Sequence, residues 1–308
     1  MPDILYSTAY IMRETIVKLD KISKYYGSFA AVDELDLAVN KGEIVGIIGH
    51  NGAGKTTTLK MIVGLITPTA GSLTVMGQDI QKNGLKVKKS LGYLPEENPL
   101  YENMTAQEYL AFFSDIYGMP RKKAAERGES LLDSLKLEAG KKLIGEMSKG
   151  MKRKVSIART LIHDPDLLIL DEPNSGLDPL TSFFIIDYLK NLPKEGKTII
   201  LSAHNLFHVE YICDRIAILK RGKLIVFDTM DNLRKSLGTR EFEIVFKSEF
   251  NLDYPRKDGN YSVKTSNIEE MANLLRKISD NNWALVDLAI RQSALEDIYL
   301  DIMSDEKL

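Results

Sequence analysis

The sequence predicts an α/β fold for most of the chain and a small α+β domain at its C-terminal end. Two short runs, 43–48 and 167–170, are rich in Ile, Val and Leu, as buried strands of a parallel sheet are. The first run leads into a glycine-rich turn and then into apolar residues at helical spacing. After about Gly238 the pattern changes to alternating strands and amphipathic helices, which indicates a second domain.

The composition is typical of a globular protein in a reducing compartment. The chain has 308 residues, of which 44% are hydrophobic and 27% charged, and its formal net charge is -2. This near balance gives no reason to expect nucleic acid or a bare anionic membrane as a partner. Cys213 is the only cysteine, which excludes an internal disulfide. No run reaches the ~18 to 20 apolar residues that span a bilayer, so we expect any membrane role to require a partner chain.

The N-terminal segment, 1–14, contains no predicted element and no signal-peptide pattern, and we expect a tail, with Met12 as an alternative start. Alternation of apolar and polar residues then predicts strands at Thr15–Leu19 and Ala30–Val39. Tyr26 lies at the turn between them, where its ring could stack on an adenine base. The alternative is a packed surface tyrosine, which is the commoner role of an aromatic side chain.

The glycine-rich turn contains the pattern G-x-x-x-x-G-K-[ST] between a strand and a helix. Glycines lack a Cβ, so such a loop can turn its N–H groups toward a phosphate at the positive end of the following helix. Lys55 would reach the β- and γ-phosphates, and the Thr56 hydroxyl would ligate Mg²⁺. A glycine-rich turn that binds nothing is the alternative, but the strand–loop–helix context favours a nucleotide site. We expect phosphate contacts along the whole loop: Gly49, His50, Asn51, Gly52, Ala53, Gly54, Lys55, Thr56 and Thr57.

A helical insertion is predicted at about 97–160. The strand Ser90–Leu94 leads into an acidic turn that contains Glu96. Helices are then predicted at Met104–Tyr117, with Thr105 as the cap, and at Arg121–Leu135.

A third helix begins at Ser148, which suits an N-cap, carries Gly150 in its first turn and runs to about Ile162. Basic side chains gather at the end of this helix where the helix dipole is already positive: Lys149, Lys152, Arg153 and Lys154. This arrangement favours a bound anion. A solvated basic face is the alternative.

Acidic and imidazole side chains follow two further buried strands. Asp171 and Glu172 end the run Leu167–Leu170, and His204 follows the strand Thr198–Ser202. Carboxyl ends of parallel strands meet at one edge of a sheet, here beside the phosphate loop. Asp171 can then hold Mg²⁺, Glu172 can orient and partly deprotonate a water, and His204 can reach the γ-phosphate. The alternatives are an ordinary acidic strand end and a structural histidine.

We expect the first domain to span 15–235 and the small α+β domain to span 240–308. Within the second, Glu296 to Asp305 could form a docking face, although packing on its own sheet is the commoner role of such a helix. The predicted elements are strands at Phe242–Phe246, Tyr261–Lys264 and Ala284–Ile290, and helices at Ile268–Ile278 and Ala294–Met303.

Seven motifs stand in one order along the chain: Tyr26, the loop 49–57, Pro95-Glu96, M-S-K-G-M at 147–151, L-L-I-L-D-E at 167–172, S-G-L-D at 175–178 and His204. Over about 15–230 the sequence resembles the ATP-binding subunit of an ABC transporter. The segment from Ser293 to Tyr299 is similar to the small C-terminal domain of the export-type subfamily, in which ATPase and membrane chains are separate. The resemblance implies a P-loop NTPase core of the ABC ATPase type with a helical subdomain, and ATP hydrolysis with ATP and Mg²⁺ as cofactors.

The resemblance also implies partners and a mechanism. Two such domains, as a homodimer or with a paired ATPase subunit, would join head to tail around two ATP molecules. Ser148 and Gly150 of one domain would face the γ-phosphate bound by the other. Glu172 would act as general base, His204 would hold the γ-phosphate, and Asp178 would connect the two sites. The dimer would act on an integral membrane permease from the cytoplasmic face of the membrane, and power export.

Two departures from the family pattern concern coupling. Glu96 stands where Gln is usual, and its carboxylate could still reach Mg²⁺ or water, but it adds a charge. The signature retains Ser148 and Gly150, while Lys149 adds a charge and Met151 replaces an amide.

Two other functions stand beside export. An ABC ATPase could drive a membrane process other than transport, such as mechanotransmission or lipoprotein or cofactor maturation, and the sequence hardly separates this from export. A soluble nucleic-acid factor is disfavoured, because the chain carries one ATPase half, lacks heptads between its phosphate loop and its acidic strand, and has balanced charge.

Overall fold

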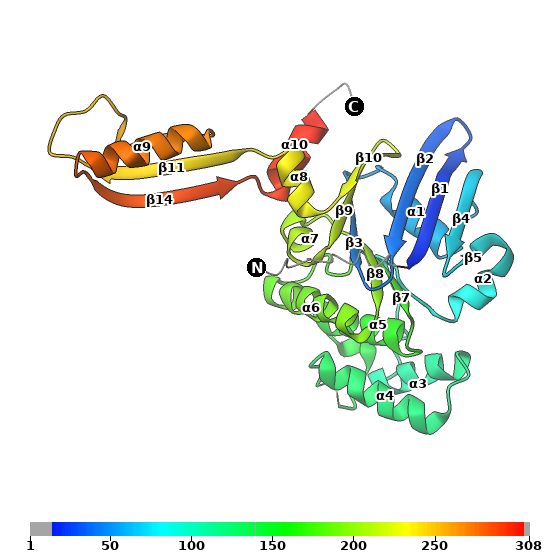
Figure 1. The fold of residues 1–308 in the computed structure, drawn as a ribbon. Helices are drawn as coiled ribbons and strands as arrows, with labels where there is room; N and C mark the ends of the chain where they lie inside the picture. Colours follow the sequence, from blue (N-terminus) through cyan, green and yellow to red (C-terminus); the bar gives the residue numbers. More distant parts are fainter. Residues whose placement is uncertain (1–13, 139, 305–308) are drawn as a thin grey trace, which may run out of the picture. The chain divides into compact units, whose positions relative to one another are not determined.

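The computed structural model describes residues 14–138 and 140–304 and divides into unit 1, Met1–Asp228, and unit 2, Thr229–Leu308 (Figure 1). The predicted tail, apart from its last residue, and the start at Met12 lie outside the described residues. The division falls earlier than the expected linker because α8 (Met230–Ser236) packs against α10 (Leu295–Ser304) within unit 2. Among the described residues, no helix has both the length and the apolar character that crossing a membrane requires.

A six-stranded, mainly parallel sheet forms the centre of unit 1, in the order β10-β9-β3-β8-β7-β6 (Figure 1). Its inner strands β3, β7 and β8 are short apolar runs with every residue buried, as expected for strands covered on both faces. Parallel pairing of β3 with β8 and of β8 with β7 brings their carboxyl ends to one edge. The strands are β3 (Ile44–Ile48), β6 (Leu91–Leu94), β7 (Leu167–Asp171), β8 (Thr198–Ser202), β9 (Arg215–Lys220) and the antiparallel β10 (Lys223–Asp228).

A four-stranded antiparallel sheet, in the order β2-β1-β4-β5, packs beside α1 (Lys55–Ile62). Alternating burial along β2 turns one of its faces to the core, which includes Val39 of β2, Leu59 of α1 and Ile47 of β3. The first strand is longer than predicted because β1 continues through polar residues that pair with β2 on one side and β4 on the other. The strands are β1 (Thr15–Tyr26), β2 (Phe29–Asn40), β4 (Ala70–Val75) and β5 (Gln78–Asp79).

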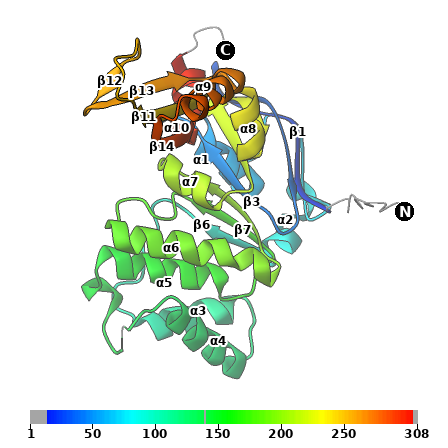
Figure 2. The ribbon, with the colours of Figure 1, turned by 60° about the vertical axis from the view of Figure 1, so that its left-hand side comes forward.

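Helices cover the other side of the parallel sheet. α5 (Lys149–Leu161), α6 (Pro179–Asn191) and α7 (Leu206–Ile212) lie there (Figures 1 and 2). α7 approaches β3 so closely that a Cβ on Gly46 would lie 2.8 Å from Val209 Cγ1. A glycine in β3 therefore allows this helix to pack on the strand that carries the phosphate loop.

The helical insertion contains α3 (Ala106–Ile116) and α4 (Arg121–Ser134), which pack on each other and on α5 (Figure 2). The prediction of α3 is confirmed, and Thr105 caps it in a reciprocal capping box with Glu108. The sequence did not predict α2 (Ile80–Lys88), in which only the two end turns bury an apolar side chain, or the short 3-10 helices Ile144–Glu146 and Leu192–Glu195.

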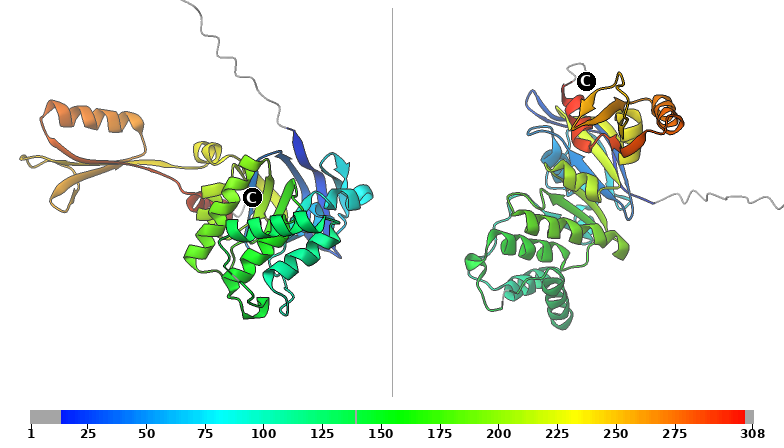
Figure 3. Two further views of the ribbon diagram at one scale, coloured as in Figure 1. Left: turned by 90° about the horizontal axis from the view of Figure 1, so that it is seen from below. Right: turned by 90° about the vertical axis from the view of Figure 1, so that its left-hand side faces the viewer.

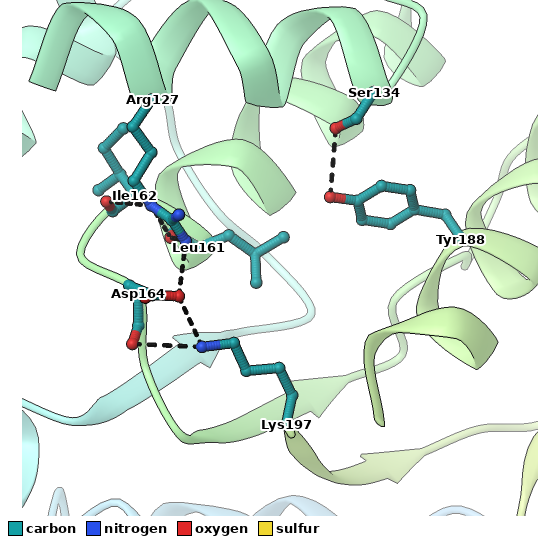
Figure 4. A network of polar contacts seen from close by, with 7 residues as sticks. All are labelled: Arg127, Ser134, Leu161, Ile162, Asp164, Tyr188 and Lys197. Atoms are coloured by element: carbon teal, nitrogen blue, oxygen red, sulfur yellow. Dashed lines mark hydrogen bonds and ion pairs between the residues drawn. The ribbon is translucent and has the colours of Figure 1, made fainter. Parts of the chain in front are cut away.

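A polar network fastens the helical insertion to the parallel sheet (Figure 4). Asp164, after α5, pairs with Arg127 of α4 at 2.9 Å and with Lys197, before β8, at 2.6 Å. The Arg127 guanidinium also donates to the carbonyl oxygens of Leu161 and Ile162. The hydrogen bond from Lys197 is the main reason why the pKa of Asp164 lies below its usual value.

Unit 2 is a four-stranded antiparallel sheet, in the order β12-β13-β11-β14, with α9 (Ile268–Asp280) on one face (Figure 3). Its core joins Ile244 and Phe246 of β11 and Tyr261 of β13 to Leu274 and Ile278 of α9. This α+β arrangement agrees with the prediction. The strands are β11 (Arg240–Lys247), β12 (Arg256–Lys257), β13 (Asn260–Thr265) and β14 (Ala284–Gln292).

Candidate functional site

A cleft of about 440 Å³ gathers the phosphate loop and residues from four other segments of unit 1. The loop leaves the carboxyl end of β3 and becomes α1 at Lys55. Most of the predicted site residues meet here, although they are far apart in the sequence. The lining residues are Phe29, Ala31, Asn51, Gly52, Ala53, Gly54, Lys55, Thr56, Thr57, Glu96, Glu172 and His204.

The loop has the geometry of an anion cradle. Gly54 has a φ of +101°, and a Cβ there would lie 2.5 Å from the carbonyl oxygen of Ala31, so only glycine fits. Lys55 is buried, and its Nζ donates to the carbonyl oxygen of Gly49 at 2.6 Å and to that of His50 at 3.3 Å. Burial lowers the pKa of Lys55, and the charges of Glu172 and Asp171 oppose this effect. A phosphate group beside the loop would add a further negative partner for this ammonium.

The acidic strand end lies beside the loop. Glu172 is buried although it lines the cleft, and its φ of +49° is the left-handed conformation that non-glycine residues rarely adopt. Its amide donates to Ser202 Oγ at 3.0 Å, and that hydroxyl donates to Asp171 Oδ1. His204 Nε2 lies 3.1 Å from Glu172 Oε1. Strain at a buried carboxylate that lines a cleft is a feature of functional sites.

The electrostatics of this acid and histidine are perturbed. The pKa of Glu172 is raised to about 7, mainly by burial; the Lys55 charge opposes this effect, and the nearby Asp171 and Glu96 carboxylates add to it. Burial also lowers the pKa of His204, and the Lys55 ammonium acts in the same direction. Near neutral pH, Glu172 can therefore exchange a proton, while the imidazole is in its neutral form.

The donor set of the cleft fits Mg²⁺. The Thr56 hydroxyl and the carboxylates of Glu96 and Glu172 line it, and Asp171 is buried next to Glu172. Within 14–138 and 140–304, no group of three His, Cys, Asp or Glu residues could hold a metal ion by itself. Mg²⁺ commonly needs only one or two protein ligands besides water and phosphate oxygens, so these oxygen donors are sufficient.

The predicted aromatic contact is less direct. Tyr26 is not among the residues that line the cleft, and Lys24 Nζ lies 5.1 Å from the centre of its ring. Phe29, which the sequence analysis did not select, lines the cleft and is 61% exposed. Tyr26 and Phe29 are opposite each other in the β1–β2 hairpin, so their rings lie on one face of it. The signal for Phe29 was an aromatic residue just after the same turn.

Ser148 and Gly150 do not line the cleft around the phosphate loop. They belong to the start of α5, where the Ser148 hydroxyl accepts a hydrogen bond from the Met151 amide as the N-cap. Near this helix start lies a second cleft of about 430 Å³, lined in part by Lys149 and Ser175. Glu96 lines both clefts.

Arg153 of α5 was interpreted from sequence as part of an anion site or of a solvated basic face, and both interpretations are wrong for this residue. Its guanidinium is buried and donates to main-chain carbonyl oxygens only, because the helix turns this position toward the sheet. The acceptors are Pro173 at 2.7 Å, Asp171 at 3.1 Å, Pro95 and Glu96 at 3.2 Å each, and Glu172. Burial lowers its pKa to about 10, so it keeps its charge at neutral pH.

Arg153 therefore joins the helical insertion to both acidic segments of the cleft. It holds the turn that contains Glu96 and the strand end that contains Glu172. Arg153 bonds the main chain of Glu96 and Glu172 and not their carboxylates, so it is a residue that positions these two acids. Every residue has a main-chain carbonyl oxygen, so residue types do not reveal which ones accept these hydrogen bonds. The sequence shows only that the helix contains an arginine.

A phosphate cradle at a strand–loop–helix junction, next to carboxylates at the end of a parallel strand, defines a P-loop ATPase. Residues 32–175 match the family described as ABC transporter. The Bacitracin transport ATP-binding protein BcrA of Bacillus licheniformis is 34% identical over 302 residues, which cover 94% of this chain and 97% of BcrA. The chain therefore belongs to the ATP-binding subunits of ABC transporters and is an ATP hydrolase.

Two further similarities agree with this family. The Probable multidrug ABC transporter ATP-binding protein YbhF of Escherichia coli is 37% identical over 239 residues, which cover 77% of this chain but only 41% of YbhF. The solved structure of the ATP-binding cassette MJ0796, described as a dimeric post-hydrolysis state bound to ADP and Pi, matches with a TM-score of 0.63 and 26% identity. That match covers 70% of this chain and 98% of the MJ0796 chain.

We predict that Arg153→Lys lowers kcat for ATP hydrolysis about 10- to 100-fold while the Kd for ATP changes little. A single ammonium cannot reach carbonyl oxygens on both segments, and a displacement of about 1 Å at a catalytic group costs on the order of 100-fold. Steady-state ATPase assays and nucleotide titration measure the two quantities, with Lys152→Ala on the same helix as the control. A wild-type kcat in a folded Arg153→Lys variant would contradict the positioning role.

Proposed function

We propose that this chain is the ATPase subunit of an exporter and acts as a head-to-tail dimer on a separate integral membrane permease. The observation that carries the proposal is the incomplete cleft. It contains the phosphate loop, Glu96, Glu172 and His204, but Ser148 and Gly150 lie outside it. A second copy can supply these two residues, and the solved MJ0796 cassette is described as dimeric.

The residues of the cleft divide the binding of Mg-ATP between them. The N–H groups of the loop 49–57 and the Lys55 ammonium would bind the phosphates, and the Thr56 hydroxyl and Asp171 would hold Mg²⁺, which would neutralise phosphate charge. Glu96 contributes a further carboxylate to the lining of the cleft. Phe29 and Tyr26 offer rings for the base from one face of the hairpin.

The hydrolytic step uses Glu172 and His204. Glu172 accepts a proton from the attacking water, since its raised pKa makes it a stronger base than an exposed carboxylate. Neutral His204, 3.1 Å from Glu172, donates to the γ-phosphate or orients the water. At the start of α5 of the second copy, the Ser148 hydroxyl and the Gly150 amide add donors to the same phosphate.

Export is supported by the relatives. BcrA is named as a bacitracin transport protein and YbhF as a probable multidrug protein. ATP-binding subunits of this family work with membrane components, which supports a location at the cytoplasmic face of the membrane through such a partner. The transported substrate is a property of the partner chain.

A groove of about 260 Å³ is suited to the membrane partner. It lies between the parallel sheet, which contributes Leu91 and Tyr93, and the helical insertion, which contributes Phe113 and Tyr117. Tyr93 is on β6, three residues before Glu96. Only a short stretch of chain therefore separates the groove for the partner from the nucleotide site. Leu65, which is 56% exposed, lines the same groove and offers apolar surface to the partner.

The first experiment is light scattering after size exclusion on Glu172→Gln, with and without Mg-ATP. We expect this variant to bind ATP without turnover and to be dimeric with Mg-ATP, because the trapped nucleotide holds the two copies together. The matched control carries Lys55→Ala in addition, and its mass should not depend on ATP. A Glu172→Gln variant that is monomeric at saturating Mg-ATP would contradict the composite site.

The general-base role predicts that kcat/KM for ATP rises with pH through about 7. Glu172 must be ionised to accept a proton, and burial raises its pKa to about 7. The lowered pKa of His204 places its titration at more acidic pH. Because kcat/KM reports the free enzyme, its profile between about pH 6 and 8.5 is the measurement. A flat profile across this range would overturn the assignment.

The groove predicts that Leu65→Asp weakens membrane association by at least about tenfold, since a carboxylate would have to be buried against the partner. Sedimentation with membrane vesicles from the native cell measures the bound fraction. Leu85→Asp, on the exposed face of α2 and outside the groove, is the control. Equal binding by both variants would mean that the partner docks elsewhere on unit 1.

A further inference from the structure

The outer edge of the unit 2 sheet is formed by β14, a nine-residue strand that pairs with β11 only. Eight of its nine residues are exposed, including Leu288 and Ile290. No other strand of the described part of the chain pairs with this edge. Proteins usually protect a strand edge of this length, because its free N–H and C=O groups can pair with another strand.

The register shows which backbone groups point outward. The Ser293 amide donates to the carbonyl oxygen of Thr239, in line with the pairing of Ile290 with Phe242. Hydrogen-bonded pairs alternate along an antiparallel ladder, so Ala289 turns its backbone groups toward β11. The N–H and C=O groups of Leu288 and Ile290 consequently point away from β11, toward the open edge.

The side chains of Leu288 and Ile290, the two residues whose backbone groups point to the open edge, form an apolar fringe. Leu288 and Ile290 lie opposite Ile244 and Phe242, so they share the sheet face that α9 covers. The helix packs on β11 and β13, and the fringe extends beyond it. Leu288 is 39% exposed and Ile290 57% exposed.

The other face of the strand carries two opposite charges at a symmetric spacing. Asp287 and Arg291 lie two residues before and two residues after Ala289. Arg291 also pairs across the sheet with Glu243 at 3.0 Å and is 64% exposed at its side chain, so one side of its guanidinium is free for a second carboxylate. Such a spacing is complementary to itself when the strand direction is reversed.

The geometry points to a second copy of this chain as the partner of this edge, with the two β14 strands antiparallel about a two-fold axis at Ala289. In this register Asp287 lies opposite the partner subunit's Arg291, and Leu288 lies opposite the partner subunit's Ile290. Symmetry makes each contact twice. A shift by one residue would turn the apolar fringe to the charged face, and a shift by two residues would place Ala289 or Ser293 opposite Asp287, so only this register pairs both faces.

The contact requires no nucleotide. It would join the two unit 2 sheets into one continuous sheet, and it would keep two ATPase chains together when their nucleotide sites are empty. The inference is therefore independent of the ATP-dependent dimer proposed above, and the two can be tested separately.

Disulfide formation tests the register in the full-length chain without nucleotide. The Ala289 pair would be a non-hydrogen-bonded one, with Cα atoms about 4.5 Å apart, which a disulfide can bridge. The two Asp287 Cα atoms would be separated by four residues of strand, about 13 Å. We expect Ala289→Cys to give a disulfide-linked dimer on a non-reducing gel, while Asp287→Cys and the wild type, which retains Cys213, give none. Failure of Ala289→Cys to link, or equal linking of both variants, would overturn the register.

Light scattering without nucleotide tests the contact itself. We expect the wild type to be a dimer and Leu288→Lys to be at least tenfold weaker in self-association, with Leu300→Lys, on the exposed side of α10, as the control. A monomeric wild type at tens of micromolar would overturn the inference, whatever else covers the edge. Adding Glu172→Gln and Mg-ATP to the Leu288→Lys chain separates the two proposals, since the ATP-dependent dimer should still form.

Discussion

One buried guanidinium connects the segments of unit 1 that line the cleft. Arg153 extends from α5 and donates to the carbonyl oxygens of Glu96 and Glu172, and both residues line the cleft. A buried cation is costly unless its hydrogen bonds are satisfied, and here main-chain oxygens satisfy them. The first turns of α5 are consequently hydrogen-bonded directly to the main chain of the two acidic segments of the cleft.

The charges inside the cleft depend on one another. Burial favours the neutral forms of Lys55 and Glu172, and the charge of each favours the charged form of the other. Loss of the Lys55 ammonium would thus raise the pKa of Glu172. His204 stays neutral beside this pair, which suits a group that donates to a phosphate without repelling the lysine.

The sequence predicted those cleft residues whose type follows from the expected chemistry. It did not predict residues whose contribution depends only on where the fold places them. The loop 49–57 and the strand end at Glu172 have types and spacing that phosphate and magnesium require. The residue type of Arg153 does not show whether its side chain faces solvent or five carbonyl oxygens, so only the structure revealed its role. The helix α2 was missed because it buries only Ile80 and Val87, too few for a periodic pattern. Phe29 was missed because only the pairing within the β1–β2 hairpin shows that it shares a face with Tyr26.

The clamp by Arg153 also bears on how this sequence can change over evolutionary time. It binds the carbonyl oxygen of residue 96 and not the side chain, so the backbone of the turn keeps its place whichever residue stands there. Exchange of Glu96 for a neutral glutamine would therefore change the charge that lines the cleft and leave this hydrogen bond in place. A single substitution at position 96 can thus alter the electrostatics of the cleft while the main chain that shapes it is retained.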